Sequence, residues 1–161
     1  MKQRIDKQAI ATQLNDVSLP ALLRFARRAF GWDMRQALKQ AGCDDMPRNG
    51  MFLVGAIART GSKNAEVVRE LGLTKQAASQ LVDTLVLRGY ITRSPDPQDR
   101  RRMNILLTER GELAARAARE ASDKLEAKIV EMLGDDYMMN TKVTLGVIID
   151  SNEARHVPSR S

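Results

Sequence analysis

The chain has 161 residues, 43% of them hydrophobic and only 4% aromatic, so it has room for one ordinary globular domain with a mainly aliphatic core. Its 26 basic and 20 acidic residues give a formal net charge of +6, which favours nucleic acid or another polyanion as a partner. No apolar stretch approaches the roughly 20 residues of a membrane span, and the N-terminal residues lack the apolar core of a secretory signal. We therefore expect a cytoplasmic protein that does not span a membrane.

The N-terminal part of the chain predicts helices. Residues 1–17 are polar with scattered apolar positions, which is typical of a short helix or of an irregular tail. Apolar residues then recur at helical spacing over residues 19–41. Ser18 is a suitable N-cap, and Pro20 falls in the first turn, where its missing N–H is not needed. A long amphipathic helix is therefore expected over residues 19–41.

A second helix is expected from about Pro47 to Arg59, ending near Gly61. Two glycines interrupt this segment, Gly50 and Gly55. Each lowers the stability of a helix by up to about 1 kcal/mol relative to alanine.

Residues 64–89 have the layout of a helix-turn-helix motif. Asn64 is the N-cap of a short helix that Gly72 ends, and Thr74 is the N-cap of a second helix over residues 75–88. Gly89 follows that helix as its C′ residue.

The second helix of this motif has one apolar and one polar side. The apolar side consists of Ala78, Leu81, Val82 and Leu85, and the polar side consists of Lys75, Gln76, Ser79, Gln80 and Asp83. Glutamine can bridge the N6 and N7 atoms of adenine in the major groove, and lysine and serine can reach bases or phosphates. The alternative is an ordinary surface helix with a solvated polar face.

Two strands are expected next, over residues 90–93 and 103–107. Pro95 and Pro97 lie between them, where they prevent strand pairing and favour a loop. Residues 93–102 carry a net charge of +2 from clustered arginines, and arginine is drawn to the negative potential of a narrow minor groove. Such a hairpin suits a wing that contacts DNA, although a solvated charged turn is the alternative.

The C-terminal third of the chain predicts further helix. Thr108 is the N-cap of a long amphipathic helix to about Leu133, and a last segment ends near Asp150. Residues 143–149, VTLGVII, have the β-branched composition of a strand. The polar tail after Asp150 is expected to be frayed. The expected fold class is mainly α, or α+β, with little β structure.

Residues 47–115 resemble the DNA-binding core of the MarR family of winged helix-turn-helix regulators. The most specific part is PDPQDRRRMNILLTERG, residues 95–111, because the family's wing has the pattern D-P-x-D-R-R followed by an apolar strand and L-T-x-x-G. The resemblance implies that residues 143–149 are helical. It also implies three regions: N-terminal dimerisation helices (1–46), a winged helix-turn-helix with a two-stranded wing (47–108), and C-terminal dimerisation helices with the tail (109–161).

The resemblance implies a homodimer that binds double-stranded DNA. The helix from Thr74 would read the major groove and the wing would reach the minor groove, where Asp99 and Arg101 take the places of the family's paired acid and arginine. The residues expected to bind DNA are Asn64, Thr74, Lys75, Gln76, Ser79, Gln80, Asp99, Arg100, Arg101 and Arg102. Many family members also bind small aromatic or anionic effectors, which are therefore a further expected class of partner.

No catalytic or metal-binding constellation is found in the sequence. His156, the single histidine, lies in the polar tail, and one histidine with one cysteine does not make up the four ligands of a zinc site. Cys43, the single cysteine, excludes an intramolecular disulfide; a small apolar packing residue is the favoured interpretation, with redox sensing as the alternative. No enzyme activity, metal or cofactor is expected.

The sequence thus predicts a sequence-specific DNA-binding transcriptional regulator, a repressor that binds a pseudopalindromic operator as a homodimer and can be released by an effector. The alternative is a winged-helix module that binds proteins and has weak or no specific affinity for DNA. The arginine-rich wing and the Lys/Gln/Ser helix face favour the first hypothesis over the second.

Overall fold

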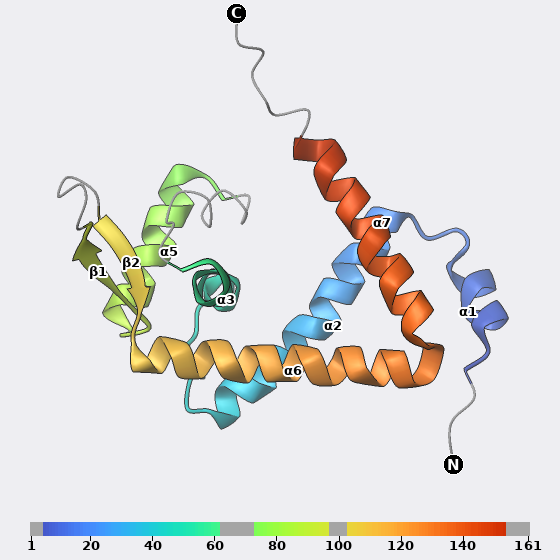
Figure 1. Ribbon diagram of the computed structural model, residues 1–161, viewed down its shortest axis with the longest axis horizontal. Coiled ribbons are helices and arrows are strands. Elements are labelled where there is room, and N and C mark those ends of the chain that lie inside the picture. The colour runs from blue at the N-terminus through green and yellow to red at the C-terminus, as the bar shows by residue number, and fades with distance from the viewer. Residues whose placement is uncertain (1–4, 62–72, 97–102, 154–161) are drawn as a thin grey trace, which may run out of the picture. The chain divides into compact units, whose positions relative to one another are not determined.

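The computed structural model describes residues 5–61, 73–96 and 103–153 (Figure 1). The chain divides into two compact units, and each is described by itself: Arg24–Ser122, and the combined ends Met1–Leu23 and Asp123–Ser161. With the labels of Figure 1, the helices are α1 (Lys7–Leu14), α2 (Leu19–Gln40), α3 (Gly50–Thr60), α5 (Lys75–Leu87), α6 (Glu109–Leu133) and α7 (Asp135–Glu153), and the strands are β1 (Ile91–Pro95) and β2 (Met103–Leu107). Over these described ranges the fold is mainly α with one two-stranded sheet, and the predicted fold class is confirmed.

The unit Arg24–Ser122 contains the hydrophobic core. Helix α3 packs against β2, and α5 packs against β1. Tyr90, Leu85 and Val54 are completely buried at its centre, and Cys43 is 1% exposed. The Cys43 thiol makes its contact with the carbonyl oxygen of Ala41, at 3.6 Å. Cysteine here serves as a small apolar residue, as the favoured interpretation of the sequence expected.

The hairpin extends further than the sequence predicted. β1 pairs antiparallel with β2 in a register that runs from Ile91 opposite Leu107 to Pro95 opposite Met103. The expectation that Pro95 would prevent pairing was therefore wrong. In a sheet of two strands both strands are edges, and a proline at the end of an edge strand can turn its missing N–H away from the partner.

The structure also corrects the start of the second predicted helix. α3 begins at Gly50 and not at Pro47, because the residues between them form a turn in which the Gly50 N–H donates to the Pro47 carbonyl at 2.8 Å. A Cβ atom on Gly50 would lie 2.8 Å from the sulfur of Met46 and 3.0 Å from a methyl group of Leu85. Close packing therefore explains a glycine in the first turn, where helix propensity alone would disfavour it.

The predicted cap of the long helix α6 is confirmed. The Thr108 hydroxyl accepts a hydrogen bond from the Gly111 N–H at 3.1 Å and donates one to the Gly89 carbonyl at 2.6 Å. Gly111 lies so close to Tyr90 that an added Cβ atom would be 2.0 Å from the Tyr90 carbonyl oxygen. Thr108 and Gly111, the threonine and the glycine of the L-T-x-x-G pattern, thus hold the start of α6 against Gly89 and Tyr90, which precede β1.

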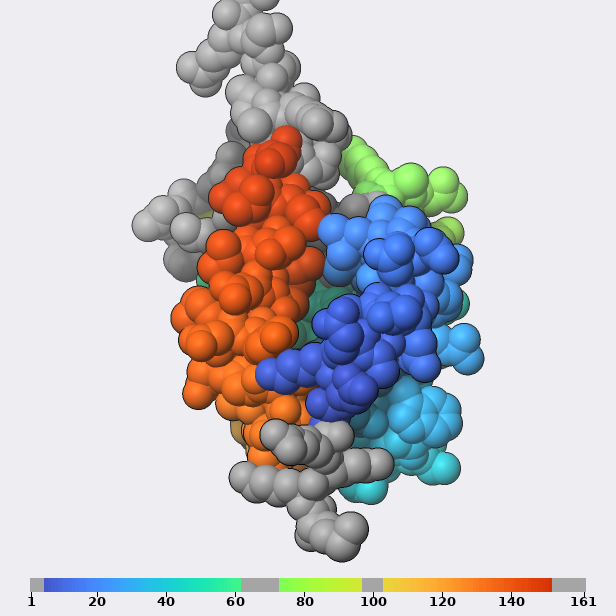
Figure 2. Space-filling model, turned by 90° about the vertical axis from the view of Figure 1, so that its right-hand side faces the viewer, coloured from blue at the N-terminus to red at the C-terminus, as the bar shows by residue number. Residues whose placement is uncertain are grey.

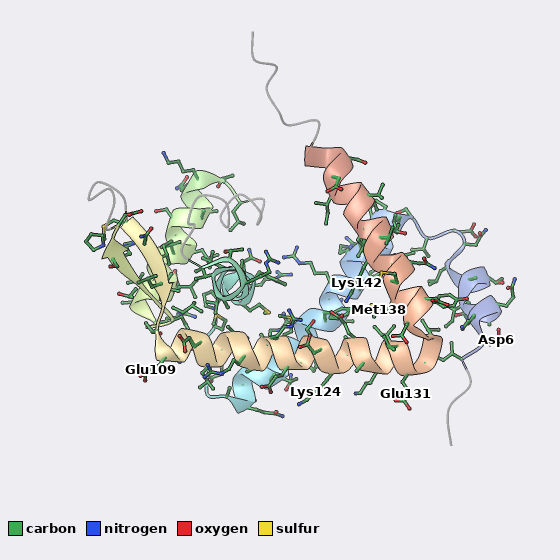
Figure 3. The ribbon with its side chains drawn as sticks, viewed as in Figure 1. Asp6, Glu109, Lys124, Glu131, Met138 and Lys142 are labelled. Atoms are coloured by element: carbon green, nitrogen blue, oxygen red, sulfur yellow. The ribbon has the colours of Figure 1, made fainter. Side chains whose placement is uncertain are left out.

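The second unit is organised around the N-terminal helix α1 and the turn between α6 and α7. The Asp6 carboxylate caps α1 by accepting hydrogen bonds from the Gln8 and Ala9 N–H groups, each at 3.0 Å (Figure 3). Lys7 donates to the carbonyl of Leu133 at 3.2 Å and lies 4.1 Å from the centre of the Tyr137 ring. Lysine at the last carbonyls of a helix is a favourable C-terminal cap, so α1 is a formed helix attached to this turn and not an irregular tail.

Helix α7 includes the segment whose composition resembles a strand. The resemblance to the MarR family implied a helix there, and this prediction is confirmed. The hydroxyl groups of Thr141, Thr144 and Ser151 each donate to the carbonyl four residues earlier, at 2.7 to 2.8 Å, a bond that helices tolerate for these side chains. Lys142 also donates to Glu126 on α6 at 2.7 Å (Figure 3).

The surface of this unit carries many large apolar side chains. α1, in deep blue, and α7, in orange to red, face the viewer in Figure 2. The large hydrophobic side chains that are at least 40% exposed in this unit are Ile10, Leu14, Leu19, Met132, Tyr137, Met139, Val143, Val147, Ile148 and Ile149. A large exposed apolar surface of this kind usually marks an interaction surface. None of the helices in the described ranges is long and apolar enough to cross a membrane.

Candidate nucleic-acid interface

The N-terminus of α5 is fixed by the predicted cap. The Thr74 backbone is extended, with φ −64° and ψ 155°, and its hydroxyl accepts a hydrogen bond from the Ala77 N–H at 3.2 Å. This cap sets where the first helical turn begins. Lys75 and Gln76 therefore lie in the first turn, where the helix dipole and free N–H groups favour an anionic partner such as phosphate.

The two sides of α5 are separated as the sequence predicted. Ala78, Val82 and Leu85 are buried against the core of their unit. The predicted base-reading residues and their neighbours are all exposed in the described chain: Thr74, Lys75, Gln76, Ser79 and Gln80. Helix α5 thus presents amide, ammonium and hydroxyl groups on a rigid scaffold, which is the chemistry that major-groove readout requires.

The other predicted site residues, Asn64, Asp99, Arg100, Arg101 and Arg102, lie outside the described residues. Their assignment remains a prediction from the sequence. The two strands that precede and follow the wing segment are described, and their register brings residues 95 and 103 opposite one another.

An ion pair that sequence reasoning missed joins α5 to β1. Arg93 Nη2 lies 2.5 Å from Asp83 Oδ1, and the two side chains are 42% and 58% exposed. Sequence reasoning assigned Asp83 to the polar side of the helix and counted Arg93 among the wing charges, but it did not pair them. The ten-residue separation crosses the turn at Gly89, so helical spacing rules alone do not reveal the contact.

A second polar cluster fixes the base of the hairpin. Asp45 Oδ1 accepts hydrogen bonds from the Tyr90 hydroxyl at 2.5 Å and from Arg110 Nη2 at 2.8 Å. Arg110 also donates to the Arg88 carbonyl at 2.6 Å, and its guanidinium lies 4.4 Å from the centre of the Tyr90 ring. Arg88 in turn donates to the Asp45 carbonyl oxygen. The cluster links the segment before α3 to the C-terminal end of α5 and to the start of α6.

The electrostatics of this cluster follow from its hydrogen bonds. The hydrogen bond from Tyr90, with the nearby positive charges of Arg110 and Arg88, holds the pKa of Asp45 below its ordinary value, against the opposing effect of burial. Burial, followed by the hydrogen bond to Asp45, raises the pKa of Tyr90. At neutral pH the carboxylate is therefore charged and the phenol is neutral, which suits the hydrogen bond that the phenol donates to the carboxylate.

The arrangement contains no candidate metal centre within residues 5–61, 73–96 and 103–153, where no three histidine, cysteine or acidic side chains gather. What it contains is an exposed helix face backed by a packed core, followed by an antiparallel hairpin. These features define the winged-helix class of fold.

The comparisons with known proteins agree with this class. A family model described as MarR family matches residues 45–102, the part of the chain that contains α3, α5 and β1. The predicted resemblance to the MarR family is thus confirmed over these residues. No curated protein matches the sequence.

Solved structures of transcriptional regulators share the fold over most of the chain. FabT from Streptococcus pneumoniae, in complex with DNA, has a TM-score of 0.69 and 20% identity, with 92% of this chain and 99% of that chain covered. MepR from S. aureus, in a DNA complex, has a TM-score of 0.67 and 24% identity, covering 85% and 98%. NadR in complex with 4-hydroxyphenylacetate has a TM-score of 0.66 and 23% identity, covering 82% and 92%. At these identities the likeness shows the fold.

Proposed function

We propose that this protein is a DNA-binding transcriptional regulator that recognises a pseudopalindromic operator as a homodimer and acts as a repressor. The observation that carries the proposal is helix α5. Its exposed face bears Lys75, Gln76, Ser79 and Gln80, its opposite face is buried, and it lies inside the segment that matches the MarR family.

The proposed contacts divide into two kinds. Gln76 and Gln80 read base edges in the major groove, while Thr74, Lys75 and Ser79 contact phosphates or neighbouring bases. The wing residues Asp99 to Arg102 reach the minor groove, with Asp99 orienting Arg101, and Asn64 is the remaining residue proposed to contact DNA. FabT and MepR, which share the fold, are solved in complexes with DNA, and this supports the assignment.

The homodimer is supported by the apolar surface of α1 and α7. Side chains such as Val143 and Val147, which are 56% and 60% exposed, are costly to leave in water, at about 25 cal/mol for each square ångström. A second copy that covers the same helices would bury them symmetrically. We propose that the regions 1–46 and 109–161 make this interface and that region 47–108 binds DNA.

Three further parts of the proposal concern chemistry and place. The protein acts in the cytoplasm as a regulator and not as an enzyme. A small organic anion is proposed as effector, since NadR, which shares the fold, is solved with 4-hydroxyphenylacetate. The competing proposal, a winged-helix module that binds only proteins, is less well supported because the exposed positions in the first two turns of α5 are polar, and Leu87 at its C-terminal end is the one large apolar side chain of this helix that is strongly exposed.

Selection of binding sites from random duplex DNA tests the function. The expected result is an enriched sequence with two inverted half-sites about one helical turn apart. If each subunit makes three or four phosphate contacts, the logarithm of the binding constant should fall with the logarithm of salt concentration with a slope of about −5 to −7. No enrichment together with a slope near zero would instead favour the protein-binding module.

A further inference from the structure

A groove of about 620 Å³ lies between α2 and α3 in the unit Arg24–Ser122. Its volume is in the range of small-molecule sites, roughly 300 to 1,000 Å³. Four of its lining residues, Arg24, Arg27, Arg28 and Arg35, come from α2, and Arg48 comes from the segment just before α3. The described lining of this groove contains no carboxylate.

The charge of this groove is unbalanced. Within the described chain none of the five guanidinium groups takes part in an ion pair. Three of them, Arg24, Arg28 and Arg35, follow one another on a single side of α2 at spacings of four and seven residues. Like charges four residues apart destabilise a helix. A partner that carries several negative charges would relieve this repulsion along α2. A single carboxylate would neutralise only one of the five.

The chemistry of the cations specifies which anion fits. Guanidinium groups match the oxygens of phosphate in paired hydrogen bonds better than a point charge does. The groove also receives Asn49 at the N-cap of α3, whose side chain makes no hydrogen bond to the helix backbone. The first N–H groups of that helix add partial positive charge to the arginines.

The groove also has an aromatic part. Phe25 and Phe52 contribute to its lining, and the Arg27 guanidinium lies 4.9 Å from the centre of the Phe52 ring. Phe25 is 54% exposed, and the Arg24 guanidinium lies 5.3 Å from the centre of its ring, so part of the ring surface is left for a planar partner. Gly31 also lines the groove and leaves space beside Arg35, because an added Cβ atom would meet only Arg35 Nη1, at 3.5 Å.

We propose that this groove binds an organic anion with two or more phosphate groups and a planar ring, the chemistry of a nucleoside polyphosphate. The role of this anion as an effector rests on the proposed function. The existence of the binding site does not depend on the proposed function. The phosphates contact Arg35 and Arg48, and the ring stacks on Phe25 or Phe52. This ligand class carries more negative charges than a small aromatic monoanion does. Several negative charges match the five arginines of the groove better than one.

Calorimetric titration of the full chain without DNA tests the site. The probes are ATP, AMP, inorganic tripolyphosphate and benzoate. ATP should bind most tightly, because it alone combines several phosphates with a ring. Arg35→Gln and Arg48→Gln should each weaken ATP binding about five- to tenfold, the effect of one charge-assisted contact. Lys39→Gln, which removes a charge from the same helix outside the groove, should change it less than twofold.

A second variant separates shape from charge. Gly31→Leu keeps all five arginines and fills the space beside Arg35, so it should abolish ATP binding if the ligand enters the groove. ATP binding that survives Gly31→Leu, or that Lys39→Gln weakens as much as Arg35→Gln, would show nonspecific attraction and overturn the proposal. Equal affinity for benzoate or for tripolyphosphate would overturn the ligand class, and so would the absence of binding at millimolar concentration.

The effector role has its own measurement. Operator affinity in saturating ATP should differ at least threefold from that without it, and Gly31→Leu should remove the difference. An operator affinity that ATP leaves unchanged would overturn the effector role. If no probe binds and Arg35→Gln lowers affinity for DNA, the groove is a contact for the DNA backbone and the proposal is wrong. Failure to bind any DNA would refute the proposed function, while nucleotide binding would be unaffected.

Discussion

The carboxylate of Asp83 on α5 is 2.5 Å from the guanidinium of Arg93 on β1, so one ion pair joins the proposed recognition helix to the first strand of the wing. Because both side chains are about half exposed, solvent screens the pair, and its contribution to folding stability is about 1 kcal/mol or less. We expect its larger effect to be on the position of the hairpin relative to the helix face that carries Gln76 and Gln80.

We therefore expect the pair to matter more for DNA binding than for folding. Asp83→Asn and Arg93→Gln should each weaken operator binding, and the double variant should lose less than the sum, with a coupling free energy of about 0.5–1 kcal/mol. Binding titrations and thermal unfolding of all four proteins measure both effects. The matched control is an exposed pair on α6, Glu112 with Arg116. An equal coupling free energy in DNA binding for this control pair would contradict the proposal that Asp83 and Arg93 position the hairpin.

Base-reading and backbone-contacting residues should differ in their effect on specificity. Gln76→Ala or Gln80→Ala should reduce preference at one or two base pairs in each half-site, by about 1–3 kcal/mol each. Arg101→Ala should weaken binding to every duplex, most of all where A-tracts narrow the minor groove. Asp99→Ala should have the same effect as Arg101→Ala but a smaller one. Binding to a matched operator and to scrambled DNA distinguishes them; unchanged affinity of Arg101→Ala for both would refute the wing assignment.

The two glycines of α3 should respond oppositely to alanine. A Cβ atom on Gly50 would press on Met46 and Leu85 at 3.0 Å or less, whereas one on Gly55 would meet nothing within 4 Å. Gly55→Ala should raise the free energy of unfolding by about 0.5–1 kcal/mol through helix propensity. Gly50→Ala should lower the free energy of unfolding by about 1–2 kcal/mol, because the cost of overpacking exceeds the gain in helix propensity. Chemical denaturation of the two variants side by side checks the signs, and stabilisation by both would contradict the packing argument.

The cluster around Asp45 should make stability depend on acid pH. The pKa of Asp45 is lowered from 3.8 in the folded chain, so its stabilisation is complete above about pH 4 and is lost as the pH falls through the folded value. Asp45→Asn should cost about 1 kcal/mol at pH 7, a figure reduced because the side chain is 41% exposed. The variant should also show a shallower loss of stability below pH 4. An unchanged acid slope would mean that Asp45 does not carry this dependence.

Dimerisation should depend on the exposed side of α7. Val147→Glu places a charge in apolar surface that a second copy would cover, so the variant should sediment as a monomer at concentrations where the parent is a dimer. Leu87→Glu, on α5 in the other unit, removes a side chain that is 86% exposed and should leave the assembly unchanged. A parent protein that is a folded monomer at micromolar concentration would refute the homodimer.

Most helices and both strands could be predicted from the sequence because their signals are local. Thr74 and Thr108 are caps that act within one turn, and the apolar stripe of α5 follows the helical period. The start of α3 and the pairing of Pro95 could not be predicted, because they depend on packing against Leu85 and on the edge position of β1. The same holds for α7, whose composition favours a strand and whose helical state was inferred only from the resemblance.

The functional residues divide in the same way. The polar side of α5 could be read from residue spacing, since burial of its other side follows from the helical period. Contacts between distant residues gave no such signal: Arg93 with Asp83, and Arg110 with Asp45 across 65 positions. The arginine groove was visible in the sequence only as charges on one helix, because Arg48 and Phe52 join it through the fold.

The burial of Cys43 has a practical consequence. The chain holds one cysteine, and this residue is 1% exposed in the core, just after the end of α2. A thiol reagent can reach it only when this part of the core opens, so the labelling rate under native conditions reports the free energy of that opening at a single known site. The protein thus carries its own chemical probe of local unfolding, and ligands that tighten the unit Arg24–Ser122 would slow the reaction in proportion to their effect on opening.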